Sequence, residues 1–295
     1  MVEDVSVGRR VFVVFNFCIL SLLAFICLYP LWYTFCLSTS DKAAANAGMV
    51  TIVPVRFTLV AFQEIIRDKA FFTSFWISIK RVTMGVSIDI VCIILFAYAL
   101  SRSKKEFFAR DIIMWINVFC MLFSAGTIPW YIFMKNYGMI DNIWGMVFAG
   151  GYSCYYTVLM MNFFKSFPRE LEEAATVDGA GKWRQLWQIV VPCSIPSIAT
   201  IMLFVGVWYW NEYFIGLVLS TSENSYPLQT YIRQIVVVIP MGQTLSQEEM
   251  IRLSKLSNKT LNAAKVFITI IPMLMVYPFI QKYFVTGIMI GAVKG

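Results

Sequence analysis

Long apolar stretches alternate with short polar segments along this chain. A helix of about 20 mostly apolar residues crosses about 30 Å of hydrocarbon, and six stretches reach that length. The predicted spans cover residues 11–35, 82–100, 112–134, 143–164, 195–220 and 266–285. The pattern therefore predicts an all-α membrane protein with six transmembrane helices, which form a single transmembrane domain over residues 1–295.

Composition agrees with this class. Hydrophobic residues make up 59% of the 295 residues and charged residues 14%, whereas about 25% of the residues of a soluble domain are charged. The chain has no histidine, and its seven cysteines lie in or beside apolar segments without a CxxC pair, so we expect no metal site. It has no Walker A sequence, no GxSxG and no catalytic constellation, so we expect neither an enzyme nor a bound cofactor.

Basic residues predict the orientation. The first apolar stretch is too long for a secretory signal and lacks a clear cleavage site, so we expect an uncleaved helix. The strongest basic signal is SRSKKEFFAR, residues 101–110, between the second and third spans. Positive residues favour the cytoplasmic side, so both termini are predicted to be cytoplasmic. The net charge of +7 suits contact with anionic lipid headgroups and does not argue for nucleic acid.

The inside loop between the fourth and fifth spans, residues 166–192, begins with a predicted helix. Pro168 can occupy its first turn. Leu171, Ala174 and Ala175 then share one apolar face. An ordinary amphipathic hairpin at the membrane interface would have the same pattern.

A turn and a second helix follow in this loop. Asp178, Gly179 and Gly181 predict the turn, because glycine tolerates the left-handed backbone that ends a helix. The second helix carries Trp183 and is predicted to end at Pro192.

Spacing in this loop resembles the EAA loop of binding-protein-dependent ABC importers. The matching positions are Glu173, Ala174, Ala175, Gly179, Ile189 and Pro192, with Val191 where the family pattern has leucine. In the family, the short helix sits in a cleft of the ATPase subunit and carries its opening and closing into the spans. The resemblance implies that Glu170–Gly181, which includes Asp178, is the coupling helix here. The Glu173 carboxylate offers a charge that can pair with an arginine of the ATPase.

Other segments extend the resemblance to nearly the whole chain. They are AYALSR (97–102), FPRELEEAATVDGA (167–180), WNEYF (210–214), YPLQ (226–229) and YPFIQKYFVTGIMIGAVKG (277–295). They resemble the carbohydrate branch of these permeases, in particular the maltose-type second subunit and the subgroup for poly- and oligosaccharides that includes alginate permeases. In maltose-type relatives the C-terminal tail reaches the ATPase, so residues 287–295 are a second candidate contact.

This resemblance implies a type I ABC importer permease fold in a bacterial inner membrane. The chain would form half of a heterodimeric pore with a second permease subunit. Its other expected partners are two ATPase subunits, which would bind ATP and Mg, and a solute-binding protein outside.

Aromatic and polar residues of the fifth span are candidates for the substrate pathway. They are Trp208, Trp210, Asn211, Glu212 and Tyr213. Aromatic rings stack on apolar sugar faces, and an amide and a carboxylate can bond hydroxyls. An aromatic packing belt with a structural hydrogen bond would explain the same residues. In the maltose relative the sugar is held mainly by the partner subunit.

Three further expectations concern charges and outer segments. Asp89 in the second span should face the interior and have a partner, and Lys80 or Arg81 could reach it only through water or by snorkelling. The basic residues predicted near the outer mouth would steer an acidic sugar; they are Lys80, Arg81, Lys135, Arg233 and Lys265. Residues 221–261 correspond in position to a loop that reaches the binding protein in maltose-type relatives, but a solvated connector would explain them as well. Residues 37–70 are expected to be a solvated connector with a short helix at Leu59–Arg67.

We therefore predict the permease subunit of an ATP-driven importer of oligosaccharides, with an acidic, alginate-like sugar as a hypothesis. A neutral oligosaccharide or another solute stays open. A secondary transporter working alone would show inverted repeats, broken helices at the midplane and several intramembrane charges. We find no convincing repeat between the two halves.

Overall fold

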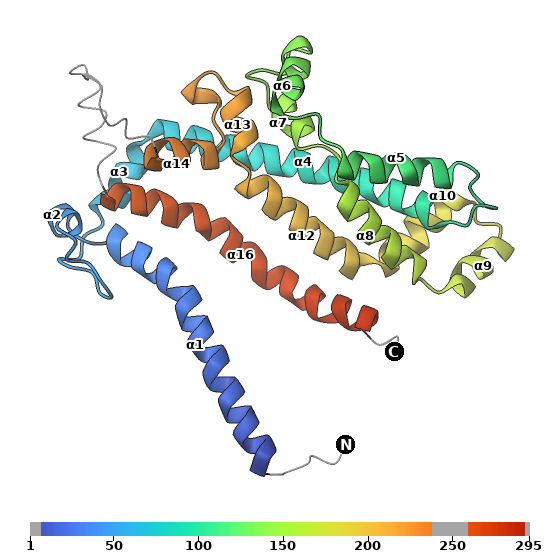
Figure 1. The fold of residues 1–295 in the computed structure, drawn as a ribbon, viewed down its shortest axis with the longest axis horizontal. Coiled ribbons are helices and arrows are strands. Elements are labelled where there is room, and N and C mark those ends of the chain that lie inside the picture. Colours follow the sequence, from blue (N-terminus) through green and yellow to red (C-terminus); the bar gives the residue numbers. More distant parts are fainter. Residues whose placement is uncertain (1–6, 238–258, 293–295) are drawn as a thin grey trace. The chain divides into compact units, whose positions relative to one another are not determined.

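A computed structural model describes residues 7–237 and 259–292 of the chain, which are helical with no strand among them (Figure 1). The helices are α1 (Val7–Ser38), α2 (Lys42–Asn46), α3 (Val60–Arg67), α4 (Lys69–Ser101), α5 (Arg110–Leu122), α6 (Thr127–Asn136), α7 (Ile143–Gly150), α8 (Cys154–Lys165), α9 (Arg169–Val177), α10 (Lys182–Gln185), α11 (Val191–Cys193), α12 (Ile195–Asn211), α13 (Phe214–Leu219), α14 (Leu228–Val237) and α16 (Lys259–Ala292). A π-helical turn, Leu186–Val190, joins α10 to α11. The short helix predicted before the second span is confirmed as α3.

Helix length and apolar character identify the candidate spans. Three helical segments of the described residues qualify alone: α1, α4 and the part of α16 from Lys259 to Val276. Two more qualify if each pair of helices joined at a bend is counted as one span. The chain bends by 112° between α5 and α6, and by 81° between Lys182–Cys193 and α12. The described residues thus hold three to five candidate spans, and the number six stays a prediction.

Three predicted spans each contain an interruption. Residues 112–134 are broken before α6, where Gly126 has a φ of +81°. Residues 143–164 are broken between α7 and α8, where Gly151 has a φ of +63° and the Ser153 hydroxyl accepts the Tyr156 N–H at 3.4 Å. Glycine at positive φ and a serine cap both end helices, so a continuous helix was the wrong expectation at these two places. Residues 195–220 are divided between α12 and α13.

The chain divides into two compact units. Unit 1 comprises residues 1–69 and 234–271. In this unit the loop after α1 folds back on the helix, since Trp32 Nε1 donates to the Ile52 carbonyl at 2.7 Å. The Phe35 and Phe267 rings lie 5.3 Å apart, which packs α1 against α16.

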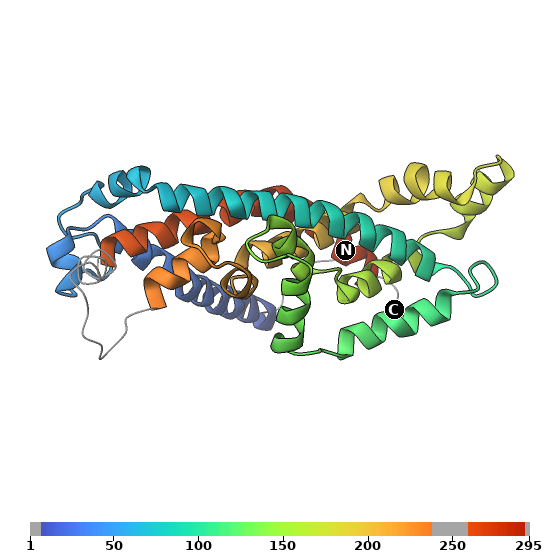
Figure 2. The ribbon, with the colours of Figure 1, turned by 90° about the horizontal axis from the view of Figure 1, so that it is seen from above.

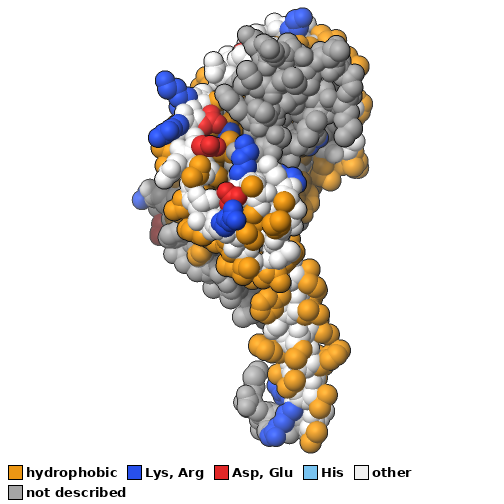
Figure 3. Space-filling view, turned by 90° about the vertical axis from the view of Figure 1, so that its left-hand side faces the viewer, with side chains coloured by type: hydrophobic (Ala, Val, Ile, Leu, Met, Phe, Trp, Pro, Cys, Tyr) orange, Lys and Arg blue, Asp and Glu red, His pale blue; other side chains and the backbone are white. Residues whose placement is uncertain are grey.

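Apolar side chains surround α1 on every side. None of its most apolar 18-residue window is buried within the chain. Figure 3 shows this surface on the helix at the bottom of the view. A helix that is hydrophobic all round requires an apolar environment, so α1 is suited to lipid or to a partner's spans.

Unit 2 comprises residues 70–233 and 272–295 and is organised along α4 (Figures 1 and 2). Its core joins α4, α8, the 182–193 segment and α12, with Ile93, Met160, Leu186 and Ile201 all buried. The hairpin of α9 and α10 lies at the end of unit 2 opposite α14 (Figures 1 and 2). The predicted coupling loop is therefore beside the C-terminal end of α4.

Candidate functional site

The turn of the α9–α10 hairpin follows the prediction. Gly179 has a φ of +77°, and its N–H donates to the Thr176 carbonyl at 3.0 Å. The next N–H, of Ala180, donates to the Ala175 carbonyl at 2.9 Å. These two bonds form a Schellman motif, which satisfies the last carbonyls of α9 and favours glycine at the left-handed position. Gly181 has an ordinary φ of −65° and caps α10.

One face of α9 is packed against its own chain. Glu172 and Ala175 are buried on this face. Thr176 donates to the Glu172 carbonyl at 2.8 Å and accepts from Gln185 Nε2 at 2.9 Å. Gln185 is itself buried and also donates to the Ala180 carbonyl at 2.8 Å. This network holds α9 and α10 together as one body.

The opposite face of α9 is open. Leu171, Glu173, Ala174 and Val177 are exposed, and Val177 has 88% of its surface accessible. The sequence predicts one apolar face of Leu171, Ala174 and Ala175; this is wrong for Ala175, which is buried against its own chain while Leu171 and Ala174 are exposed. The open face instead combines apolar groups with the Glu173 carboxylate.

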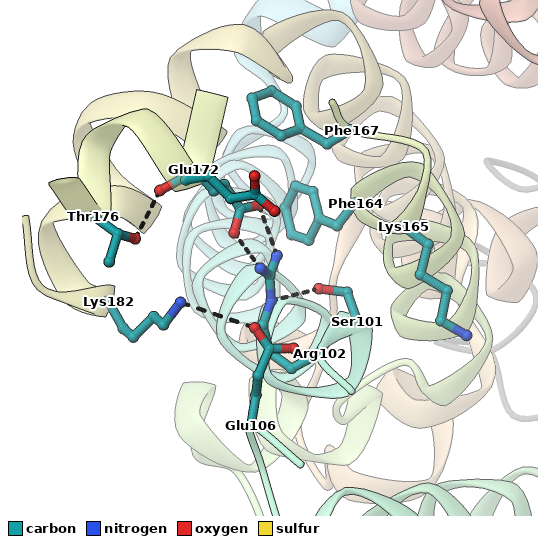
Figure 4. Close-up of a pocket in the computed structure, with 10 residues that line it drawn as sticks. Ser101, Arg102, Glu106, Phe164, Lys165, Phe167, Glu172, Thr176 and Lys182 are labelled. Carbon is teal, nitrogen blue, oxygen red and sulfur yellow. Dashed lines mark hydrogen bonds and ion pairs between the residues drawn. The ribbon is translucent and has the colours of Figure 1, made fainter. Parts of the chain in front are cut away.

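Arg102 joins the end of α4 to this hairpin (Figure 4). Its guanidinium forms a two-pronged ion pair with Glu172, in which Nη1 bonds Oε2 and Nη2 bonds Oε1 at 3.0 Å. The guanidinium also lies 4.3 Å from the ring centroid of Tyr98, and its Nε donates to the Ser101 hydroxyl at 3.2 Å. Sequence reasoning missed this contact, although AYALSR and LEEAA belong to segments that it had selected.

A polar cleft opens beside the ion pair, between the end of α4, the end of α8 and the hairpin (Figure 4). Lys182 lies 4.0 Å from Glu106 across this cleft, and Lys165 points away from the pair. The Ser103 backbone N–H and hydroxyl both donate to Glu106, which holds the pKa of this carboxyl below its usual value.

Beyond the turn, the helical segment passes its predicted end. It continues through Pro192 to Cys193. Pro192 falls in the first turn of α11, where its missing N–H is tolerated. Leu186 and Val190 enter the core of unit 2, Ile189 is half-buried, and Trp183 remains exposed.

The predicted pathway residues lie where α12 ends. Trp208 and Asn211 are exposed, whereas Trp210 is buried and meets the Phe75 ring edge-on at 6.1 Å. Tyr213 lies beneath the Arg233 guanidinium, 4.1 Å from the ring centroid. The group is therefore split between an open surface and the core.

Glu212 is bound to a buried arginine. Arg81 Nη2 lies 2.7 Å from Glu212 Oε2, and only 1% of the Arg81 side chain is exposed. The same guanidinium donates to the carbonyls of Glu212 at 3.1 Å and Met146 at 3.3 Å. The other Glu212 oxygen accepts the Ile215 N–H at 2.8 Å, at the start of α13. Glu212 thus stabilises the break between α12 and α13.

Asp89 faces the interior, as predicted. The Tyr209 side chain lies beside Asp89, and the Tyr209 hydroxyl donates to the Val147 carbonyl at 3.1 Å.

Two of the basic residues predicted for the outer mouth are neutralised. Arg81 is paired with Glu212, and Lys265 Nζ lies 2.6 Å from Asp68 Oδ2. Lys80 and Lys135 are exposed. The predicted outer loop falls partly on residues 238–258, and the tail partly on 293–295, which lie outside the described residues.

Known proteins resemble this chain over nearly its whole length. A family model described as "Binding-protein-dependent transport system inner membrane component" matches residues 6–290. The chain is 32% identical to the polygalacturonan/rhamnogalacturonan transport system permease protein YtcP of Bacillus subtilis (strain 168), covering 97% of this chain and 99% of the relative. It is also 32% identical to Protein LplC of the same organism, covering 97% and 96%. A crystal structure of a bacterial ABC transporter involved in the import of the acidic polysaccharide alginate is 34% identical, with a TM-score of 0.84, and covers 95% of this chain and 98% of that one.

Proposed function

The chain belongs to the family of inner membrane components of binding-protein-dependent transport systems, and from this premise we propose that it is a permease subunit of an ABC importer for oligo- or polysaccharides. Its family consists of transport permeases rather than enzymes. The observation that carries the substrate class is the similarity, at 32% and 34% identity over nearly the full length, to sugar-polymer transport proteins.

The sugar that we propose is acidic. The alginate transporter imports an acidic polysaccharide, and polygalacturonan, named for the Bacillus relative, is likewise a polymer of uronic acids. Each uronic acid unit carries one carboxylate. A polymer that contains uronic acids is therefore named for both relatives.

Energy would come from a separate ATPase. We propose that two ATPase subunits bind ATP and Mg, that one of them receives the open face of α9, and that Glu173 pairs there with an arginine. Apolar groups flank this carboxylate on α9, since Leu171 and Val177 are exposed. Such a face matches a helix that docks in a groove of a soluble partner. Both chain termini would then be on the cytoplasmic side.

A second permease subunit would complete the pore. The apolar surface of α1 needs an apolar partner or lipid, and a heterodimer would supply part of it. On the outside, a solute-binding protein would deliver the sugar. Trp208, Asn211 and Tyr213 are the proposed pathway residues of this chain, because they are not enclosed in the core.

Interrupted helices would also suit a secondary transporter that works alone. The family match over residues 6–290 favours the importer instead. A transporter working alone would also have no use for the open docking face of α9.

The proposal is tested by ATP hydrolysis in the reconstituted complex with its solute-binding protein. Uronate oligomers and neutral oligosaccharides of equal length form the panel, and the complex without binding protein is the control. We expect stimulation by uronate oligomers. Stimulation by neutral sugars alone would refute the acidic substrate but retain the importer, and transport without any ATPase partner would refute the importer itself.

A further inference from the structure

The Arg102–Glu172 ion pair crosses from the end of a spanning helix to the inner face of the proposed docking helix. We propose that Arg102 is a positioning residue for ATP-driven transport: through Glu172 it makes α4 follow the movement of α9. This inference rests on the proposed function and adds to it a second route of transmission into the spans.

The geometry of the ion pair fixes the orientation of α9 relative to the end of α4. The two side chains are 13% and 8% exposed, and two parallel bonds join them. A planar guanidinium in a two-pronged pair fixes orientation as well as distance. Tyr98 and Ser101, both on α4, fix the other side of the guanidinium. Rotation or translation of α9 is therefore resisted at the end of α4.

Other ties between the hairpin and α4 are weaker. The Tyr98 hydroxyl reaches the Lys182 carbonyl at 3.4 Å, near the limit of a hydrogen bond. Lys182 and Glu106 are 4.0 Å apart and largely exposed, an arrangement that contributes little. Both ties also end on Lys182 of α10, whereas Glu172 belongs to α9 itself.

The first route runs along the chain. From α10 the helical segment continues through Leu186 and Val190 into the core and on to α12. This route moves α12, and the ion pair adds α4. The two helices meet around Tyr209, so both routes converge on one packed contact.

An ion pair that only stabilises the fold would make the same contacts. The test therefore needs a measurement that loss of a purely structural ion pair would not change. We would compare Arg102→Met and Glu172→Gln with the exchanged pair Arg102→Glu/Glu172→Arg in the complete complex. Lys182→Met is the matched control, because it removes a cation from the same cleft. The measurements are copurification of the ATPase, ATP hydrolysis without sugar, and sugar transported per ATP hydrolysed.

Arg102→Met should keep the ATPase and the hydrolysis without sugar, but lower the sugar transported per ATP by about twofold to thirtyfold. The exchanged pair should restore a large part of this ratio, and Lys182→Met should leave it unchanged. An unchanged ratio in Arg102→Met would overturn the inference alone.

If Arg102→Met lost the ATPase, the exchanged pair would decide. Return of both the ATPase and the transport ratio would support the inference, whereas return of the ATPase without the ratio would overturn it. Absence of any ATPase from the unmodified complex would refute the proposed function, and the inference with it.

Discussion

Replacement of Glu212 by glutamine should destabilise unit 2, because it leaves the buried Arg81 guanidinium without a countercharge. Arg81 is enclosed to 99%, so water cannot compensate for the lost carboxylate. Removal of one partner of a buried ion pair costs about 3–5 kcal/mol. Arg81 would keep its bonds to the carbonyls of Met146 and Glu212, and a glutamine oxygen can still accept one bond. We therefore expect the lower end, about 3 kcal/mol.

The double variant Arg81→Met/Glu212→Met should be more stable than Glu212→Gln. It removes both charges, and replacement of a buried pair by apolar side chains is often neutral. Lys104→Met is the control, because Lys104 and Asp111 form an exposed pair whose loss should hardly change stability.

The assay is reversible unfolding of the purified protein in mixed micelles, followed by far-ultraviolet circular dichroism, with sugar transport measured in parallel. The reasoning would be refuted if Glu212→Gln were as stable as Lys104→Met. Loss of transport at unchanged stability would instead assign Glu212 to the sugar pathway.

Three further outcomes follow from local geometry. Gly85→Ala should cost about 1–3 kcal/mol in the same unfolding assay, because a Cβ there would overlap the buried Tyr209 ring. Gly206→Ala should be nearly neutral, since a Cβ there would meet only Val86 Cγ2, at 3.8 Å. Gly179→Ala should cost about 1–2 kcal/mol from its positive φ, with no clash, and should loosen the hairpin as measured by hydrogen exchange. The Asp141 carboxylate accepts hydrogen bonds from the Thr221 hydroxyl and N–H, which lower the pKa of Asp141. The ionised carboxylate therefore stabilises the fold above about pH 4, and this contribution is lost as the pH falls through the lowered pKa. Asp141→Asn should therefore be less stable than the unmodified protein at pH 7, and the difference should shrink in acid; a difference independent of pH would contradict this.

Local signals predicted local structure well. The short helix α3 and the turn at Gly179 depend on neighbouring residues, and both are present. The interruptions of the third and fourth predicted spans also had local signals, in Gly126 and in the sequence GGYS from residue 150. The prediction of continuous spans was based on the number of consecutive apolar residues. Hydrophobicity alone does not show whether the backbone of a span is one continuous helix.

The ion pair between Arg81 and Glu212 was not predicted from the sequence. Arg81 and Glu212 are 131 residues apart, and no spacing rule connects them. The sequence shows each as a charge in or near an apolar segment. It predicts Arg81 near the outer mouth of the pore and Glu212 in the substrate pathway. Their opposite signs and the cost of burying either alone would have favoured a pair.

This pairing changes the argument for an acidic sugar. Steering depends on the charge that remains after neutralisation, and a paired cation contributes little beyond about 8–10 Å at physiological salt. Arg81 and Lys265 are each bound to a carboxylate, so they cannot be counted toward steering. A preference for uronates would then depend on exposed cations such as Arg233, whose guanidinium lies over Tyr213, or on the binding protein and the second permease subunit. The acidic-substrate proposal therefore stands on the relatives, and the basic residues of this chain add less to it than their number suggests.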